Sequence, residues 1–101
     1  MFATVYRLKV TPGRESDALA LNEAWYRERA PRVKGFVSTC IVKSITTDGE
    51  YLGVTIFDSK ENYTRNANDP VQHQWYLRMR ECLESDPEWN DGPVISTFPT
   101  N

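Results

Sequence analysis

The chain has 101 residues, of which 40% are hydrophobic, and 12 basic against 14 acidic residues give a formal net charge of −2. This length predicts a single domain over 1–101, and the near-neutral charge gives no long-range attraction toward nucleic acid or anionic lipid. The N-terminal residues lack the basic segment and the long apolar stretch of a signal peptide. We therefore expect no signal peptide, no membrane span and a cytoplasmic protein.

The first predicted strand, residues 2–10, is apolar on both of its faces. Successive side chains of a strand point to opposite sides, so Tyr6 and Leu8 fall on one face and Val5 on the other. The strand predicted over 51–57 has the same property. Two helices cover only one side of a small sheet, and the remaining apolar side therefore predicts a homodimer.

A helix is predicted over 14–29 and ends before Pro31. Leu21 and Trp25 are four residues apart and share one face of this helix. Trp25 therefore either fills the core or lines a pocket next to the sheet.

The middle of the chain predicts a β-hairpin. A strand dense in β-branched residues covers 36–45, an Asp-Gly turn lies at 48–49, and the strand 51–57 follows. Cys40 and Cys82 lack the close spacing of a metal or redox motif. Both are predicted to be buried small hydrophobic residues rather than a disulfide.

Two further helices are predicted after the hairpin. Asp58 and Ser59 are the cap candidates of the first, which runs to about residue 67. The second covers 70–85, with Asp69 as its N-cap and Gln72 as a capping-box partner that reaches back.

The apolar stripe of the second helix places Trp75 against the sheet. His73 lies about 200° around the helix axis from Trp75, so it is predicted to face water. The stripe consists of Val71, Trp75, Met79, Cys82 and Leu83.

Residues 86–93 are rich in turn formers and predict a connector, after which a last strand is predicted over 94–98. Trp89, inside this acidic connector, either caps a pocket mouth or reaches across a dimer. The order strand, helix, strand, strand, helix, strand predicts an α+β, ferredoxin-like split βαβ sandwich. Its antiparallel four-stranded sheet has helices on one face, and two sheets facing each other in a dimer close an α+β barrel.

Four segments share the order and spacing of one known family. They are YRLKVTPGRE at 6–15, VKGF at 33–36, YLGVTIFDSKENY at 51–63 and ANDP at 67–70. On these motifs the chain resembles the antibiotic biosynthesis monooxygenase family of the dimeric α+β barrel superfamily. The resemblance implies a homodimer with a pocket between sheet and helices in each subunit. Some members oxygenate polycyclic aromatics or quinols with molecular oxygen and no bound cofactor.

Other members of that family cleave haem and carry an Asn on the first strand, a Trp on the short helix and an axial His on the final helix. The matching positions here hold Tyr6, Asn66 and Trp75. An indole offers iron no lone pair in its ordinary form. The resemblance therefore does not extend to haem degradation.

The candidate site is an aromatic pocket suited to a flat conjugated ligand. Asn66 is placed to hydrogen-bond a phenolic or quinone oxygen, and Tyr6 or Tyr76 to stabilise a substrate anion. The catalytic candidates are Tyr6, Asn66 and Tyr76, and the substrate-binding candidates are Trp25, Trp75, His73 and Trp89. A lone histidine forms no metal cluster, and neither a metal nor a cofactor is expected.

Two functions follow as hypotheses. One is a cofactor-independent monooxygenase acting on a small aromatic or quinonoid metabolite. The other is a non-catalytic small-molecule-binding or assembly protein of the same fold, which the lack of a clear acid or base in the predicted pocket favours. The expected partners are a second copy of the chain and a small aromatic ligand, with no nucleic acid and no membrane.

Overall fold

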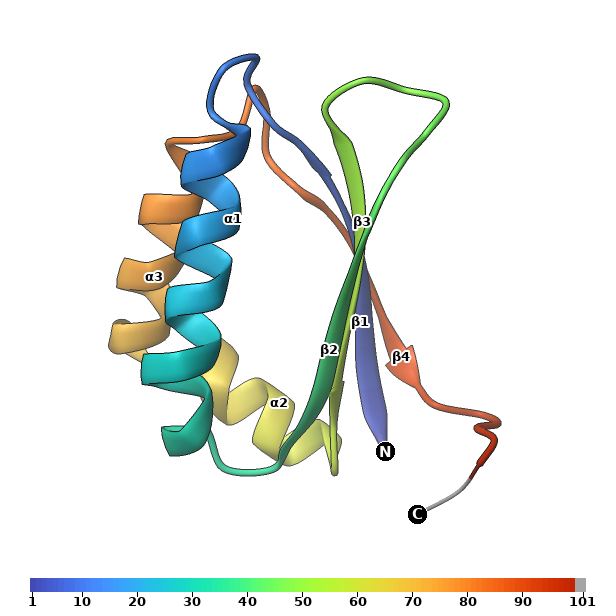
Figure 1. The fold of residues 1–101 in the computed structure, drawn as a ribbon. Helices are drawn as coiled ribbons and strands as arrows, with labels where there is room; N and C mark the ends of the chain where they lie inside the picture. Colours follow the sequence, from blue (N-terminus) through green and yellow to red (C-terminus); the bar gives the residue numbers. More distant parts are fainter. Residues whose placement is uncertain (100–101) are drawn as a thin grey trace.

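The computed structural model describes residues 1–99, and its four strands form one sheet with helices on one side (Figure 1). The strands are β1 (Phe2–Lys9), β2 (Phe36–Lys43), β3 (Glu50–Phe57) and β4 (Glu88–Pro93). The helices are α1 (Glu15–Ala24), α2 (Lys60–Ala67) and α3 (Pro70–Arg80), with a π-helical turn η1 (Trp25–Arg29) and a 3-10 turn η2 (Ala30–Arg32) after α1.

The strand order is β2-β3-β1-β4, and every neighbouring pair is antiparallel. β1 lies in the middle, where it pairs with β3 over its whole length and with β4 from Phe2 to Arg7. This arrangement is the predicted ferredoxin-like split βαβ fold.

The sheet has one face under the helices and one open face, as the alternation of β1 predicts. Thr4 and Leu8 are buried on the helix side, whereas Val5 is 44% exposed on the open face. Residues opposite each other in neighbouring strands point to the same side, so the register extends the open face across the sheet. Its apolar members are Ala3, Val5, Cys40, Val42, Leu52, Val54 and Ile56.

The prediction for the last strand is wrong. The expected connector contains β4, and residues 94–98 form no strand; Ile95 is 95% exposed and Phe98 97% exposed. Turn-forming residues are tolerated in β4 because it is an edge strand with only one neighbour to bond, and Pro93 stands at its end.

Three other boundaries differ from the predictions. The strand expected over 36–45 ends at Lys43, and α3 ends at Arg80 rather than at residue 85. The chain then turns so that Leu83 forms a β-bridge with Val10. The helix expected over 14–29 widens into the π-helical turn η1 for its last five residues. Such wide turns often occur at functional sites.

Two predictions of burial are also wrong. Val71 is 51% exposed because the α3 face toward the sheet is formed by Gln72, Trp75, Tyr76 and Met79. Cys40 is exposed on the open face, whereas Cys82 is buried as predicted, and both thiols are free.

The predicted helix caps are confirmed, with one exception. Ser59 accepts a hydrogen bond from the backbone N–H of Asn62, and Asp69 accepts one from that of Val71. The Gln72 side chain does not reach back to the cap. Its Oε1 instead accepts a hydrogen bond from the indole of Trp25.

Gly53 of β3 determines how the Tyr6 side chain lies on the sheet. The two residues are opposite each other in the register, and the Tyr6 ring occupies the space that a Cβ at Gly53 would take. The ring therefore lies flat on the sheet, with its hydroxyl 3.3 Å from Thr55 Oγ1.

We expect Gly53→Ala to lower the free energy of unfolding by about 1–3 kcal/mol, because the new methyl group forces the Tyr6 ring out of its place. In a Tyr6→Ala background the same change should be neutral or stabilising, since alanine loses less backbone entropy on folding than glycine. Urea unfolding of the four proteins measures both effects. An equal cost in both backgrounds would show that the Tyr6 contact is not the cause.

Candidate functional site

A cavity of about 480 Å³ lies between the sheet and the helices. It is lined by β1, β2 and β3 on one side, by α1, α2 and α3 on the other, and by β4 at one edge. All seven predicted site residues line it: Tyr6, Trp25, Asn66, His73, Trp75, Tyr76 and Trp89. The structure thus brings the candidates together, while their catalytic and binding roles stay predictions.

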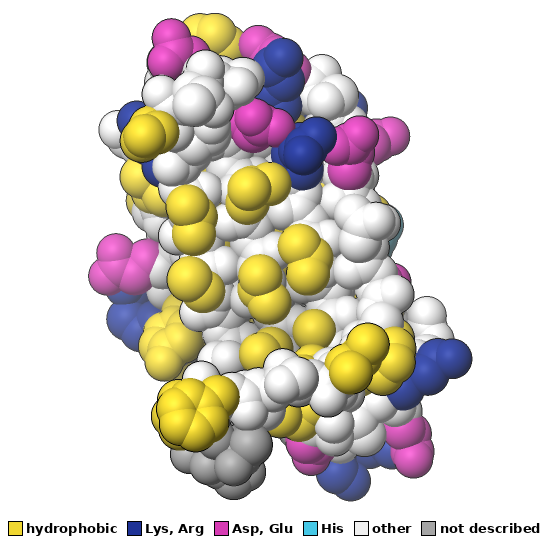
Figure 2. All heavy atoms as spheres, turned by 90° about the vertical axis from the view of Figure 1, so that its right-hand side faces the viewer, with side chains coloured by type: hydrophobic (Ala, Val, Ile, Leu, Met, Phe, Trp, Pro, Cys, Tyr) yellow, Lys and Arg dark blue, Asp and Glu magenta, His cyan; other side chains and the backbone are white. Residues whose placement is uncertain are grey.

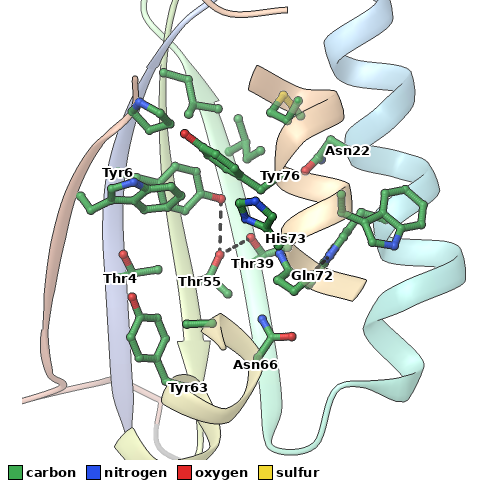
Figure 3. Close-up of a pocket in the computed structure, with 18 of the residues that line it drawn as sticks. Thr4, Tyr6, Asn22, Thr39, Thr55, Tyr63, Asn66, Gln72, His73 and Tyr76 are labelled. Carbon is green, nitrogen blue, oxygen red and sulfur yellow. Dashed lines mark hydrogen bonds between the residues drawn. The ribbon is translucent and has the colours of Figure 1, made fainter. Parts of the chain in front are cut away.

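The floor of the cavity carries a row of three hydroxyl groups (Figure 3). Thr55 Oγ1 lies 3.3 Å from the Tyr6 hydroxyl and 2.9 Å from Thr39 Oγ1. Three hydroxyls have three protons, and the two hydrogen bonds within the row use only two of them. One O–H donor therefore remains free to bind a ligand or water.

A second polar group lies where β4 meets β1. Asp91 accepts hydrogen bonds from Thr4 Oγ1 at 2.6 Å and from the Tyr63 phenol at 2.8 Å. Burial, and then the hydrogen bond to Asp91, raise the pKa of Tyr63 to about 12. Asp91 is the one carboxylate among the described residues that line the cavity.

One wall of the cavity is a chain of aromatic rings. The Trp89 ring lies 5.2 Å from that of Tyr6 and 6.5 Å from that of Tyr76, and the Tyr76 ring stacks on His73 at 6.2 Å. Trp89 belongs to β4 and forms part of this wall. His73 is exposed, as predicted, and it also lies at the edge of the cavity.

The helical wall contains the two other tryptophans. Trp25 Nε1 donates to Gln72 Oε1 at 2.9 Å, which joins η1 to α3 within this wall. Trp75 is half-buried, and the guanidinium of Arg78 lies 4.6 Å from its ring centre. Both indoles therefore line the cavity rather than filling a closed core.

Asn66 lies at the lower end of the cavity as Figure 3 draws it, next to a buried arginine. Arg29 is only 8% exposed, and its Nη2 donates to Asn66 Oδ1 at 2.9 Å and to Asp69 Oδ2 at 3.2 Å. The backbone N–H of Val71, and in smaller part Arg29, lower the pKa of Asp69. The contact thus pairs a guanidinium with an ionised carboxylate.

The sequence reading missed Thr4, Thr39, Thr55, Tyr63 and Asp91 as lining residues. A signal for Thr4 and Thr55 was present, because each shares the core face of its strand with apolar residues. Asp91 had no such signal, since its segment was predicted to be a connector.

Residues 1–99 contain no cluster of three metal-ligating side chains, and no helix among them is long and apolar enough to cross a membrane.

No protein-family model and no curated protein sequence matches this chain. Solved structures do match it. SnoaB, a cofactor-independent oxygenase from Streptomyces nogalater, superposes with a TM-score of 0.75 at 18% identity, covering 98% of this chain and 97% of its own. A Caulobacter crescentus protein provisionally named an antibiotic biosynthesis monooxygenase gives 0.83 at 14% identity, covering 94% and 90%. One from Bordetella bronchiseptica with the same provisional name gives 0.79 at 21% identity, covering 94% and 97%.

The chain has the antibiotic biosynthesis monooxygenase fold. The resemblance found in the sequence is thereby confirmed at the level of the fold. At such low sequence identity, these similarities establish the fold alone. The reaction has to be inferred from the site itself.

Tyr63 should keep its proton up to about pH 12, compared with 10.0 for an ordinary tyrosine. Because the folded state binds this proton more tightly than the unfolded chain, the stabilisation is complete below pH 10 and is lost as the pH rises to 12. The tyrosinate absorbance of the wild type minus that of Tyr63→Phe should show a step near pH 12. A step near pH 10 would contradict both the burial of Tyr63 and its contact with Asp91.

Proposed function

We propose that this protein is a cofactor-independent monooxygenase-like protein that acts on a small aromatic or quinonoid metabolite. The observation that carries the proposal is the cavity of about 480 Å³, which combines aromatic walls with a hydroxyl row and a single carboxylate. Its size falls in the range of sites for small organic ligands, and its stacked rings suit a flat ligand. The shared fold with a cofactor-independent oxygenase supports the same reading.

In such a reaction the substrate supplies the electrons itself. The keto tautomer of a hydroxylated polycyclic aromatic contains a non-aromatic ring carbon that bears two hydrogens. This carbon loses a proton to a base, and the resulting anion transfers electrons to molecular oxygen. One oxygen atom becomes a carbonyl oxygen of the product, and the other leaves as water with the two hydrogens, so no external reductant is needed. The protein has to accept the proton, stabilise the anion and exclude water.

The residues around the cavity suit these tasks. Asp91 is the candidate proton acceptor, and the hydroxyls of Tyr6 and Tyr76 are candidates for stabilising the anion. Asn66 is the candidate for holding the substrate oxygen, while Trp25, Trp75, Trp89 and His73 form the surfaces against which a flat ring packs.

One observation favours the non-catalytic alternative, a small-molecule-binding or assembly protein. Both carboxylate oxygens of Asp91 already accept hydrogen bonds from hydroxyl groups of the protein. Such bonds stabilise the carboxylate and make it a weaker base.

The test is incubation of the pure protein with a panel of hydroxylated naphthalenes and anthracenes, with and without oxygen. We expect a product that contains one atom from isotopically labelled oxygen gas, and a rate at least about a hundredfold lower for Asp91→Asn. Identical products with and without oxygen would contradict the oxygenase. Thermal stabilisation by a panel member without any product would establish the binding alternative.

We also infer that two copies pair through their open sheet faces. Figure 2 shows apolar side chains gathered over the middle of this face, and Val42 and Leu52 there are 55% and 40% exposed. Arg7, on the same face, already pairs with Glu50 at 2.8 Å and Glu88 at 3.3 Å. A partner therefore needs apolar surface rather than opposite charge, and an identical face supplies it.

Leu52→Lys should convert a dimer into a monomer, because the interface would bury an unpaired ammonium group. The matched control is Leu19→Lys, since Leu19 is 51% exposed on α1, away from the open face. Light scattering during gel filtration at micromolar concentration measures both variants. A wild-type monomer at that concentration would contradict the dimer.

A further inference from the structure

Arg29 is a charged residue buried at the end of the cavity where Asn66 lies. A side chain of this kind is almost never buried without a specific partner, because removing a guanidinium from water is costly. The π-helical turn η1 carries it inward, between α2 and the start of α3. Its Nε is buried and has no hydrogen-bond partner among residues 1–99, which adds to the cost of burying the side chain. Packing alone is therefore a poor explanation for its position.

The contact with Arg29 fixes the orientation of the Asn66 amide. A guanidinium only donates hydrogen bonds, so the Asn66 atom that faces it has to be the oxygen. The amide nitrogen then lies on the other side of the group. Figure 3 shows this nitrogen on the sheet side of Asn66, where the side chain lines the cavity.

We propose that Arg29 is a positioning residue that keeps the N–H donors of Asn66 directed into the cavity, so that this end binds a carbonyl or ionised hydroxyl oxygen of the ligand. The proposal rests on the proposed function, because it needs the cavity to hold a ligand. With its orientation fixed, Asn66 gives this end of the cavity a preference for hydrogen-bond acceptors. An asparagine that is free to turn over has no such preference, because it can present either its N–H groups or its oxygen.

Two electrostatic effects strengthen the preference. The hydrogen bond from Arg29 polarises the amide and makes its N–H groups better donors. The charge of Arg29 is only partly offset by Asp69, whose side chain is 38% exposed and whose other oxygen is taken by the backbone of Val71. Residual positive potential behind Asn66 therefore favours an anionic oxygen.

A purely structural role for Arg29, tying η1 to α2 and α3, predicts a different result. Asn66→Asp tests the acceptor-binding role without breaking the tie, because the new carboxylate keeps an oxygen for Arg29 but has no N–H to offer. A structural tie should be kept or strengthened by this change. The acceptor-binding role should be lost.

The experiment measures the binding of naphthoquinone, which has acceptor oxygens, and of naphthalene, which has none. We expect Asn66→Asp to weaken naphthoquinone binding about tenfold or more and to leave naphthalene binding within about twofold. Arg29→Lys, which keeps a charged donor, should retain the preference for the quinone better than Arg29→Met. Urea unfolding identifies any variant that fails to fold, and the Asn66→Asp result then decides.

The second readout is the pKa of bound hydroxynaphthoquinone, which changes colour on ionisation. Wild-type protein should lower this pKa, and Asn66→Asp should raise it; His73 and Asp91 line the same cavity and are identical in both proteins. Equal quinone affinity and equal pKa in the two proteins would overturn the role of Arg29 while leaving the proposed function standing. A wild-type protein that binds neither naphthoquinone nor naphthalene would contradict the proposed function and this inference with it.

Discussion

A four-stranded sheet has two faces, and this chain supplies helices for only one of them (Figure 1). The strands are nevertheless apolar on both sides, so burial on one face leaves Val5, Val42 and Leu52 in contact with water on the other. Because the helices cover only one face, every site residue that belongs to a helix lies on that side of the sheet. The protein therefore has one face available for a ligand site and another for association.

Between the layers, the chain leaves space instead of filling it. The core cluster centred on Leu8, Val10 and Leu83 lies at one end of the sheet. Toward the other end, threonines replace aliphatic residues on the floor. Buried hydroxyls are costly unless they are hydrogen-bonded, and here they bond to one another and to Asp91. The floor is therefore polar, and its hydroxyl groups satisfy almost all of their hydrogen bonds within the protein. One O–H donor remains free.

The polar groups of the cavity differ in what supports them. Asp91 is held by hydroxyls from β1 and α2, whereas Asn66 is held by a buried cation from η1. A carboxylate with two donors accepts further hydrogen bonds, and an amide whose oxygen is occupied donates them. The two groups therefore give the cavity opposite preferences toward the oxygens of a ligand.

The sequence by itself determined the order and type of most elements, because those depend on local patterns. Alternation in β1 and β3, the Asp-Gly turn at 48–49 and the caps Ser59 and Asp69 act through near neighbours in the chain. Together with the order of segments they were enough to predict the ferredoxin-like fold and the aromatic residues around the cavity.

Only the tertiary structure decided where the last strand lies and which polar groups enter the cavity. The segment 88–93 becomes a strand through pairing with β1, more than eighty residues away, and that pairing overrides its turn-forming residues. Asp91 enters the site with that strand. Arg29 and Asn66 are likewise 37 residues apart, and their contact depends on the packing of η1 against α2. No local pattern marks such contacts, because their free energy comes from burial and from partners that only the folded chain brings together.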